Sequence, residues 1–363
     1  MECVLFEKYP GLKNNIAWKS LGNFPTPVRR LEKLGGEIGY ENIWIKEDNK
    51  SSDYYGGNKV RKLEFTLPDA LHKKKKTIMT YGGIGTNHGL ATVIHGSRLG
   101  LNTLLLMVEQ PVTAHVQENL LLDRHFGAEL YYAQNTPRAA LRTILYFLSK
   151  MGNVYYLPPG GSSVLGSLGF VAAAFELKRQ IDAGEIPEPK YIFAALGSKG
   201  TVAGLLVGTR LAGLSSKVIG VRVAYLWLAN EKATAKLANN VISLMRRYDK
   251  SVPAIKFSEE DVQVLHDFCG GGYGVPTAEG REAIEILERA ENMELDLTYT
   301  GKTFAALLNF VKTNKELNNA PILYWHTYNS VDLTTIIKQD HDYRKLPKAF
   351  HQFFKTNFIP YIE

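Results

Sequence analysis

Residues 56–65 read GGNKVRKLEF, and they are the most informative stretch of the chain. The two glycines free the backbone, and Asn58 can cap a helix whose first turn then holds Lys59. The positive end of the helix dipole disfavours an ammonium group, so we expect a lowered pKa at Lys59 and an amine that can act as nucleophile or base. The alternative interpretation is a solvated lysine on a capped amphipathic helix.

Two further turns connect an apolar strand to a helix. Residues 82–89, GGIGTNHG, bring backbone N–H groups together with Thr86, Asn87 and His88, a set that suits a carboxylate. Residues 197–204, GSKGTVAG, have small side chains that let backbone amides approach a phosphate. The first turn is not a dinucleotide fingerprint, because His88 occupies the place of the third glycine. A plain glycine-rich connection is the alternative interpretation.

Short apolar and β-branched runs alternate with segments of helical length, which predicts βαβ units around largely parallel sheets. The predicted strands are 42–46, 77–81, 103–108, 129–133, 154–157, 191–196, 218–223 and 322–325. The predicted helices are 59–72, 87–99, 114–126, 138–151, 164–183, 201–213, 231–248, 278–290 and 302–313.

Two loops rich in Gly, Pro or Ser, 51–57 and 158–163, are typical of hinges. If the chain crosses between domains at both, residues 59–164 form a small domain inserted into a large domain made of 1–58 and 165–363. A ligand would then lie in the cleft between the two domains.

The composition of the 363 residues, 45% hydrophobic and 22% charged, excludes a disordered or fibrous protein. The net charge of +7 allows an anionic partner, but residues 73–76, KKKK, follow a predicted helix end and complement its dipole. No nucleic-acid-binding motif is present. Residues 300–303, TGKT, lack the glycine that a nucleotide P-loop needs five positions before Gly301, since that residue is Asp296.

The two cysteines, Cys3 and Cys269, have no disulfide or metal-ligand spacing, which indicates a reducing compartment and no metal site. The N-terminus has no signal-peptide pattern, and no apolar run is long enough to span a membrane. We therefore expect a cytoplasmic protein.

Together these segments resemble the fold type II pyridoxal-phosphate enzymes, the tryptophan synthase β-like superfamily. The sequence is most similar to the D-cysteine desulfhydrase and 1-aminocyclopropane-1-carboxylate deaminase family, from about residue 21 to residue 327. Four more motifs carry the resemblance at matching relative positions: PPGGSSVLGSLGF (158–170), GSKGTVAGL (197–205), GYGVP (272–276) and YTGKT (299–303). The resemblance implies a two-domain α/β fold with parallel-sheet cores, pyridoxal 5′-phosphate in the interdomain cleft, and a homodimer.

The resemblance also implies roles for individual residues. Lys59 would bond to pyridoxal phosphate and then move the Cα proton of the substrate, while Asn87 would hydrogen-bond the 3′-oxygen of the cofactor. The phosphate would be held by Lys62 and by the loop residues Gly197, Ser198, Lys199, Gly200 and Thr201. The substrate carboxylate would meet Thr86, Asn87 and His88.

The departing group would face Tyr273 and Tyr299, which completes a catalytic set of Lys59, Thr86, Tyr273 and Tyr299. In the ring-opening deaminases a glutamate keeps the pyridine nitrogen protonated, but here that residue is Thr300. The resemblance implies that the hydroxyl of Thr327 would be the partner of this nitrogen. The ring should then be a weaker electron sink. His88, where the deaminases carry glutamine, also favours elimination over ring opening. These positions favour α,β-elimination from a small D-amino acid, with D-cysteine giving pyruvate, sulfide and ammonia.

The alternatives are a 1-aminocyclopropane-1-carboxylate deaminase, a reaction also classed with hydrolases, or an eliminase for another β-substituted amino acid. A third is a catalytically altered pyridoxal-phosphate-binding relative. Three departures from the family pattern keep them open: Thr86 in place of serine, Lys199 in place of glycine, and Tyr328 and Asn329 in place of two glycines.

Overall fold

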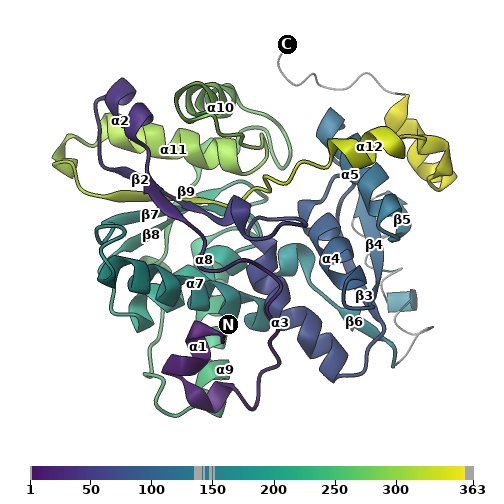
Figure 1. Ribbon diagram of the computed structural model, residues 1–363, viewed down its shortest axis with the longest axis horizontal. Coiled ribbons are helices and arrows are strands. Elements are labelled where there is room, and N and C mark those ends of the chain that lie inside the picture. The colour runs from purple at the N-terminus through teal and green to yellow at the C-terminus, as the bar shows by residue number, and fades with distance from the viewer. Residues whose placement is uncertain (1, 135–140, 142–143, 147–148, 150–151, 356–363) are drawn as a thin grey trace. The chain divides into compact units, whose positions relative to one another are not determined.

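The computed structural model describes residues 2–134, 141, 144–146, 149 and 152–355 (Figure 1). The chain forms two compact units: unit 1 is Met1–Phe65 with Ser162–Ser330, and unit 2 is Thr66–Gly161 with Val331–Glu363. These boundaries differ from the sequence-based domains, which placed 59–65 in the small domain and all of 165–363 in the large one. Burial of apolar side chains explains the assignment of 59–65 to unit 1 and of 331–355 to unit 2.

Unit 1 is built on a sheet in the order β1-β2-β10-β7-β8-β9, in which only β1 is antiparallel to its neighbour. The strands are β1 (Val28–Arg30), β2 (Ile43–Glu47), β7 (Tyr191–Leu196), β8 (Lys217–Arg222), β9 (Gln263–Leu265) and β10 (Ile322–His326). Figure 1 shows helices on both faces of this sheet, as a mostly parallel sheet requires.

The helices of unit 1 form two layers. One layer is α2 (Glu32–Ile38), α10 (Ala278–Glu291) and α11 (Thr300–Thr313), which share a buried cluster with β2 and β10. On the other face lie α7 (Val164–Asp182) and α8 (Gly200–Leu211), with α1 (Val4–Lys8) and α9 (Glu231–Tyr248) packed outside them. Helix α3 (Lys59–His72) begins in unit 1, where Phe65 packs against Phe6 and Leu168. This burial explains why 59–65 belong to unit 1.

Unit 2 has a parallel sheet in the order β5-β4-β3-β6. Its strands are β3 (Thr77–Gly83), β4 (Asn102–Val108), β5 (Glu129–Gln134) and β6 (Val154–Tyr156), and its helices are α4 (Asn87–Ser97), α5 (Ala114–His125) and α12 (Thr334–Gln339). Leu346, Phe350 and Phe353 near the C-terminus are buried in one cluster with Leu105 and Leu120. This apolar packing places 331–355 in unit 2.

The parallel α/β architecture predicted from the alternating pattern is confirmed, and three predicted elements, 59–72, 191–196 and 231–248, have the observed bounds. The predicted helix 138–151 lies largely outside the described residues. The prediction missed α1, α2, α12, β1 and β9, which are too short for a clear period. Short 3₁₀ turns complete the fold: Pro10–Leu12, Asp48–Lys50, Pro159–Gly161, Glu259–Asp261, Asp267–Cys269, Lys315–Leu317, Tyr343–Lys345 and Lys348–Phe354.

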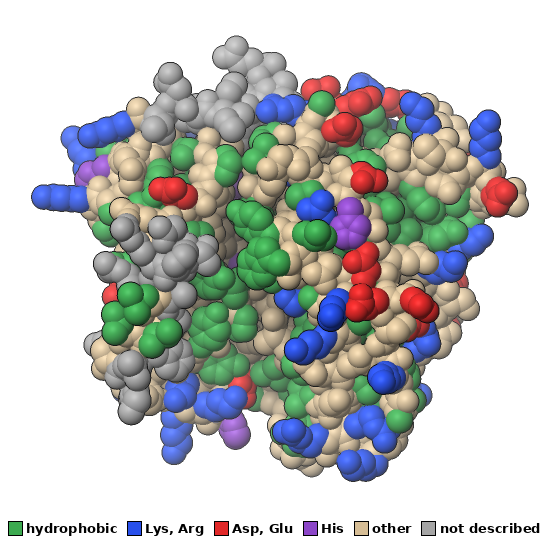
Figure 2. Space-filling view, turned by 180° about the vertical axis from the view of Figure 1, so that it is seen from behind, with side chains coloured by type: hydrophobic (Ala, Val, Ile, Leu, Met, Phe, Trp, Pro, Cys, Tyr) green, Lys and Arg blue, Asp and Glu red, His purple; other side chains and the backbone are tan. Residues whose placement is uncertain are grey.

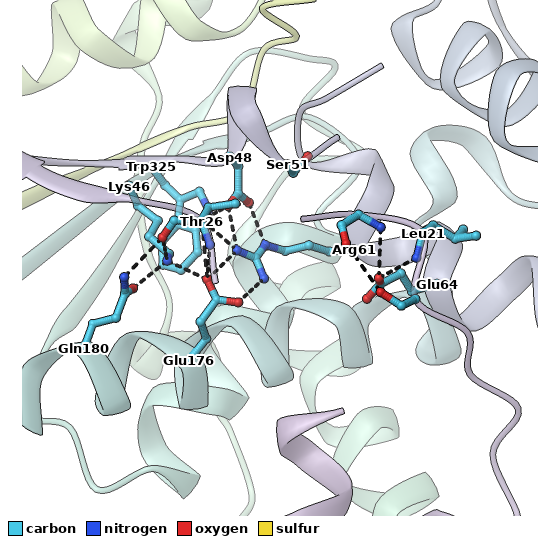
Figure 3. Close-up of polar contacts among 12 residues, drawn as sticks. Leu21, Thr26, Lys46, Asp48, Ser51, Arg61, Glu64, Glu176, Gln180 and Trp325 are labelled. Carbon is cyan, nitrogen blue, oxygen red and sulfur yellow. Dashed lines mark hydrogen bonds and ion pairs between the residues drawn. The ribbon is translucent and has the colours of Figure 1, made fainter. Parts of the chain in front are cut away.

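A buried polar network fixes the start of α3 (Figure 3). The Arg61 guanidinium donates to Asp48 Oδ1 at 2.7 Å and to Glu176 Oε2 at 2.9 Å, and Trp325 Nε1 donates to Asp48 Oδ2 at 2.7 Å. Lys46, with no exposed surface, donates to Glu176 Oε1 at 2.5 Å. Arg61 of α3 is thereby connected, directly or through one carboxylate, to β2, to Asp48, to β10 and to α7.

The charges in this network compensate one another. Burial alone would raise the pKa of Glu176, but the adjacent Arg61 and Lys46 outweigh burial and lower it to about 2. Removal of one member would leave a buried charge without its partner, which costs more than the pair itself contributes.

Replacement of Arg61 tests the network. We expect Arg61→Met to lower the free energy of unfolding of the apoprotein by about 3–5 kcal/mol, since Asp48 and Glu176 keep buried charges. Urea unfolding followed by circular dichroism measures this value. The matched control is Arg179→Met, because Arg179 pairs with Glu7 at the surface, and its loss should cost less than about 1 kcal/mol. Equal losses in the two variants would show that the network does not stabilise the fold.

Candidate functional site

The turn before Lys59 needs its two glycines. A Cβ at Gly56 would lie 2.1 Å from Asn49 O, and Gly57 has a φ of +89° with a Cβ position 2.7 Å from Thr327 O. No side chain fits at the first position, and the second requires the left-handed region that favours glycine. The next amide, Asn58 N, donates to Thr327 O at 3.1 Å. The turn is therefore pressed against the end of β10.

Asn329, one of the departures from the family pattern, contributes to this turn. Its Oδ1 accepts a hydrogen bond from Gly56 N at 2.7 Å. The side chain thus binds the backbone three residues before Lys59, a role that a glycine at this position lacks.

Lys59 is the first residue of α3 and is half-buried. Burial lowers the pKa of its amine to about 8, although the negative charge of Asp296 acts in the opposite direction. The sequence analysis expected a lowered pKa from the helix dipole, whereas desolvation is the main cause. About a tenth of the amine is then neutral at pH 7, far more than for a lysine of ordinary pKa, which suits a nucleophile or base.

A group of hydroxyl, amine and amide donors lies one turn along α3. Lys62 is 1% exposed, and its Nζ donates to Ser162 Oγ at 3.3 Å. Ser162 Oγ also lies 2.8 Å from Ser198 Oγ and accepts from Gly200 N at 3.0 Å. Gly200 is the first residue of α8, so these donors gather at a helix N-terminus.

The loop 197–201 is shaped by close contacts. Lys199 has a φ of +64°, in the left-handed region that favours glycine. A Cβ at Gly197 would lie 3.2 Å from the ring of Tyr299. Thr201 Oγ1 accepts from Asn58 Nδ2 at 3.1 Å, which ties α8 to the residue before Lys59.

The electrostatics of this group fit a phosphate. Burial and the positive charges of Lys59 and Lys199 hold the pKa of Lys62 well below its usual range. Burial also lowers the pKa of Lys199. A phosphate dianion would offset the mutual repulsion of three amines and would accept hydrogen bonds from the N-terminus of α8. The donor set therefore fits the phosphate of pyridoxal phosphate.

Tyr273 and Tyr299 form a pair. Their hydroxyl oxygens lie 2.6 Å apart, and their rings make an edge contact with centroids 5.9 Å apart. Burial raises the pKa of both phenols, and for Tyr299 the neighbouring Tyr273 and Asp296 raise it further. Both phenols therefore remain protonated at neutral pH and can donate a proton.

Asp296 organises the segment that leads to Tyr299. Its carboxylate accepts the N–H groups of Thr298, Tyr299 and Thr300 at 2.9 Å each. Thr300, which is 1% exposed, also donates its hydroxyl to Asp296 Oδ1 at 2.6 Å. The Thr300 side chain is thus engaged with Asp296.

The polar turn of unit 2 carries the remaining predicted residues. Thr86 is the N-cap of α4, and its hydroxyl accepts from Gly89 N at 3.2 Å. His88 is buried with its Nε2 3.1 Å from Thr80 Oγ1. Asn87 Oδ1 contacts two side chains of α5, those of His115 and Asn119.

Unit 1 therefore brings together the predicted residues Lys59, Lys62, Tyr273, Tyr299, Thr327 and the loop 197–201, whereas Thr86, Asn87 and His88 cluster in unit 2. Sequence reasoning missed Ser162 as the centre of the donor group, although it lies in the quoted stretch 158–170. It also missed Asp296 as a partner of the Tyr299 segment. Such partners give no local signal, because each acts on a residue brought near by the fold.

Other features of the described residues bear on function. On the face drawn in Figure 2, Lys and Arg side chains are interspersed with Asp and Glu, so the net charge of +7 does not form one basic patch there. Among the helices in the described ranges, none is long and apolar enough to cross a membrane.

Comparison with known proteins agrees with these observations. Residues 19–327 match the family described as pyridoxal-phosphate dependent enzyme. The D-cysteine desulfhydrase of Salmonella paratyphi C is 34% identical over 311 residues, 84% of this chain and 91% of that protein. The D-cysteine desulfhydrase of Salmonella newport is 33% identical over the same shares.

A solved structure described as an ACC deaminase homologue has a TM-score of 0.73 and 28% identity, and the match covers 90% of this chain and 95% of the other. The fungal L-serine ammonia-lyase of Rhizomucor miehei, at 16% identity and a TM-score of 0.60 over 90% of this chain and 99% of that one, shares the fold. These similarities favour lyases, and the expectation of a hydrolase is wrong because the curated relatives are desulfhydrases. The chain belongs to the family of pyridoxal-phosphate dependent enzymes.

Proposed function

We propose that this protein catalyses the α,β-elimination of D-cysteine, in which D-cysteine and water give pyruvate, hydrogen sulfide and ammonia. The observation that carries the proposal is Lys59, a half-buried lysine with a pKa lowered to about 8, one helical turn away from a phosphate-type donor group. The 34% identity to a D-cysteine desulfhydrase supports the substrate.

Several residues are proposed to hold the cofactor. Lys59 Nζ would bond covalently to the cofactor aldehyde. The phosphate of the cofactor would accept hydrogen bonds from the following set: Lys62, Gly197, Ser198, Lys199, Gly200 and Thr201. Thr327 would hydrogen-bond the pyridine nitrogen, and Asn87 would donate to the 3′-oxygen. The proximity of Lys62, Ser162 and Gly200 supports the phosphate assignment.

When bound, pyridoxal phosphate withdraws electrons from the Cα of the attached amino acid. Lys59 is proposed to take the Cα proton once the substrate has displaced it. The electron pair left by this proton would form a Cα–Cβ double bond as the Cβ–S bond breaks. The Tyr273–Tyr299 pair is proposed to donate a hydrogen bond to the departing sulfur, because the raised pKa values keep both hydroxyls protonated. Hydrolysis of the released enamine gives pyruvate and ammonia.

Thr86, Asn87 and His88 are proposed to receive the substrate carboxylate. The N-terminus of α4, which begins at Asn87 and is capped by Thr86, supports this because its dipole favours an anion. His88 contacts Thr80, which fixes the direction of its ring.

The second candidate is ring opening of 1-aminocyclopropane-1-carboxylate, which the similarity to an ACC deaminase homologue favours. The hydroxyl of Thr300, at the position where those deaminases carry glutamate, donates to Asp296 instead. A glutamate there would place a second carboxylate beside Asp296. The D-cysteine reaction is therefore the better supported candidate.

The altered, non-catalytic relative is less well supported. It depended on Tyr328 and Asn329, and Asn329 binds the backbone of Gly56. We also propose a homodimer, as the family resemblance implies, and a cytoplasmic location, which the buried thiols of Cys3 and Cys269 support.

Replacement of Lys59 tests the proposed reaction. We expect Lys59→Ala to lack the visible absorption band that the wild-type protein shows with pyridoxal phosphate, and to release no pyruvate from D-cysteine, because the bonding amine is gone. Absorption spectra before and after D-cysteine, with a coupled pyruvate assay, measure both. Lys75→Ala, at a half-buried lysine of the four-lysine run, should behave as wild type. A band that D-cysteine leaves unchanged in the wild type would reject the substrate and keep the cofactor.

The pKa of Lys59 predicts how cofactor uptake depends on pH. Only the neutral amine attacks an aldehyde, so the rate of band formation in the apoprotein should rise with pH to a plateau, with a midpoint at about pH 8. Asp296→Asn should move the midpoint lower, because the negative charge of Asp296 raises this pKa. Stopped-flow absorption measures the rates. A midpoint near 10.5, the ordinary value, would contradict the desolvated lysine.

Lys199 can be tested with two ligands that differ only in the phosphate. We expect Lys199→Gly to weaken binding of pyridoxal phosphate about tenfold, the worth of one hydrogen bond to a charged group, and to leave pyridoxal binding unchanged. Equilibrium dialysis with the apoprotein measures both constants. Equal effects on the two ligands would mean that Lys199 does not contact the phosphate.

A further inference from the structure

Two side chains of α5 hold the amide of Asn87. His115 and Asn119 are four residues apart on this helix, so they lie on the same face. His115 Nε2 lies 2.8 Å from Asn87 Oδ1, and Asn119 Nδ2 lies 3.0 Å from the same oxygen. All these residues belong to unit 2. The arrangement determines which end of the Asn87 amide faces α5.

The backbone oxygen of Gly85 fixes the direction of the whole group. Asn119 is 2% exposed, and its Nδ2 also donates to Gly85 O at 3.0 Å. A carbonyl oxygen only accepts hydrogen bonds, so the end of the Asn119 amide that faces Gly85 must be the NH₂ group. One hydrogen of this group serves Gly85 O, and the other serves Asn87 Oδ1, because Nδ2 lies nearer to this oxygen, at 3.0 Å, than to His115 Nε2, at 3.2 Å.

The Asn87 amide is oriented as a result. If Asn87 were turned over, its NH₂ would face the NH₂ of Asn119, and two donors would oppose each other. Asn87 therefore presents Oδ1 to α5 and directs Nδ2 away from it. We assign the tautomer of His115 that carries a hydrogen on Nε2, because this nitrogen lies nearer to the acceptor Asn87 Oδ1, at 2.8 Å, than to the donor Asn119 Nδ2, at 3.2 Å.

We propose that His115 is a positioning residue: together with Asn119 it holds Asn87 Oδ1, so that Asn87 Nδ2 is presented as a donor to the 3′-oxygen of the cofactor. This inference rests on the proposed function, which gives Asn87 its contact with the cofactor. Nothing in the local sequence around His115 indicated the role, which follows from α4 and α5 packing together.

The chemistry of the 3′-oxygen gives the proposal its signature. A donor to this oxygen stabilises its ionised form, so it lowers the pH at which the bound cofactor loses its proton and changes colour. If Asn87 is free to turn over, this donor is lost in part of the molecules. The pH midpoint of the colour change should then rise, and the affinity for the cofactor should fall.

Replacement of His115 tests this directly in the full-length protein. We expect His115→Leu to raise the pH midpoint of the absorption change by about one unit and to weaken pyridoxal phosphate binding about tenfold, each equivalent to one hydrogen bond to a charged group. His115→Gln, whose NH₂ can still donate to Asn87 Oδ1, should restore most of both values. A spectral pH titration and equilibrium dialysis measure them, and a thermal melt of each apoprotein separates a folding defect from a loss of orientation.

A second variant reverses the polarity of the group with almost no change of shape. Asn119→Asp replaces the donor with an acceptor that repels both Gly85 O and Asn87 Oδ1, so Asn87 should turn its NH₂ toward α5. The pH midpoint should rise as in His115→Leu. The matched control is His125→Leu, the same substitution at an exposed histidine that pairs with Asp340 at the other end of α5. This variant should keep the wild-type midpoint.

Each outcome has a distinct meaning. A wild-type midpoint and affinity in His115→Leu with an unchanged melt would overturn the proposal, and so would an equal shift in His115→Gln. A wild-type protein that binds the cofactor but produces no pyruvate from D-cysteine would reject the substrate alone, because the pH midpoint still reports on Asn87. A wild-type protein that forms no absorption band with pyridoxal phosphate would reject both.

Discussion

Arg61 lies two residues after Lys59, and its guanidinium is bound to Asp48, Thr26 and Glu176 in the interior of unit 1. In a helix, residues two apart point in nearly opposite directions, whereas Lys59 and Lys62, three apart, share a face. The contacts of Arg61 therefore set the rotation of α3 about its axis, and with it the direction of both lysines. With each charge compensated by its neighbour, the group forms a rigid anchor.

The orientation set by Arg61 makes the face of α3 that carries Lys59 and Lys62 positive. Lys59 and Lys62 carry amines that repel each other, and Lys199 adds to the repulsion at Lys62. The N-terminus of α8 and the hydroxyls of Ser162 and Ser198 add further donors. Such a concentration of positive charge and donors is unfavourable in the absence of an anion. A bound phosphate relieves the repulsion, and this relief strengthens phosphate binding.

A neighbouring residue that has no chemical role of its own holds each residue with a proposed chemical role in place. Ser162 connects Lys62 to α8, Asp296 arranges the backbone that presents Tyr299, and Asn329 binds the turn before Lys59. His115 and Asn119 do the same for Asn87. In each case the partner is distant in sequence or on another element, and it constrains orientation as well as position. This is how a site keeps a geometry that flexible side chains would otherwise lose.

The sequence by itself determined the alternating α/β architecture, the helix that starts at Lys59, and the glycine-rich turns on both sides of it, because periodicity and glycine placement act over a few residues. The motifs also determined the family. Only the tertiary structure decided that burial is the main cause of the lowered pKa of Lys59, that Thr300 is engaged with Asp296, and that the C-terminal residues Leu346 and Phe350 pack within unit 2. These features depend on contacts between segments far apart along the chain, and a local pattern holds no information about which of them meet.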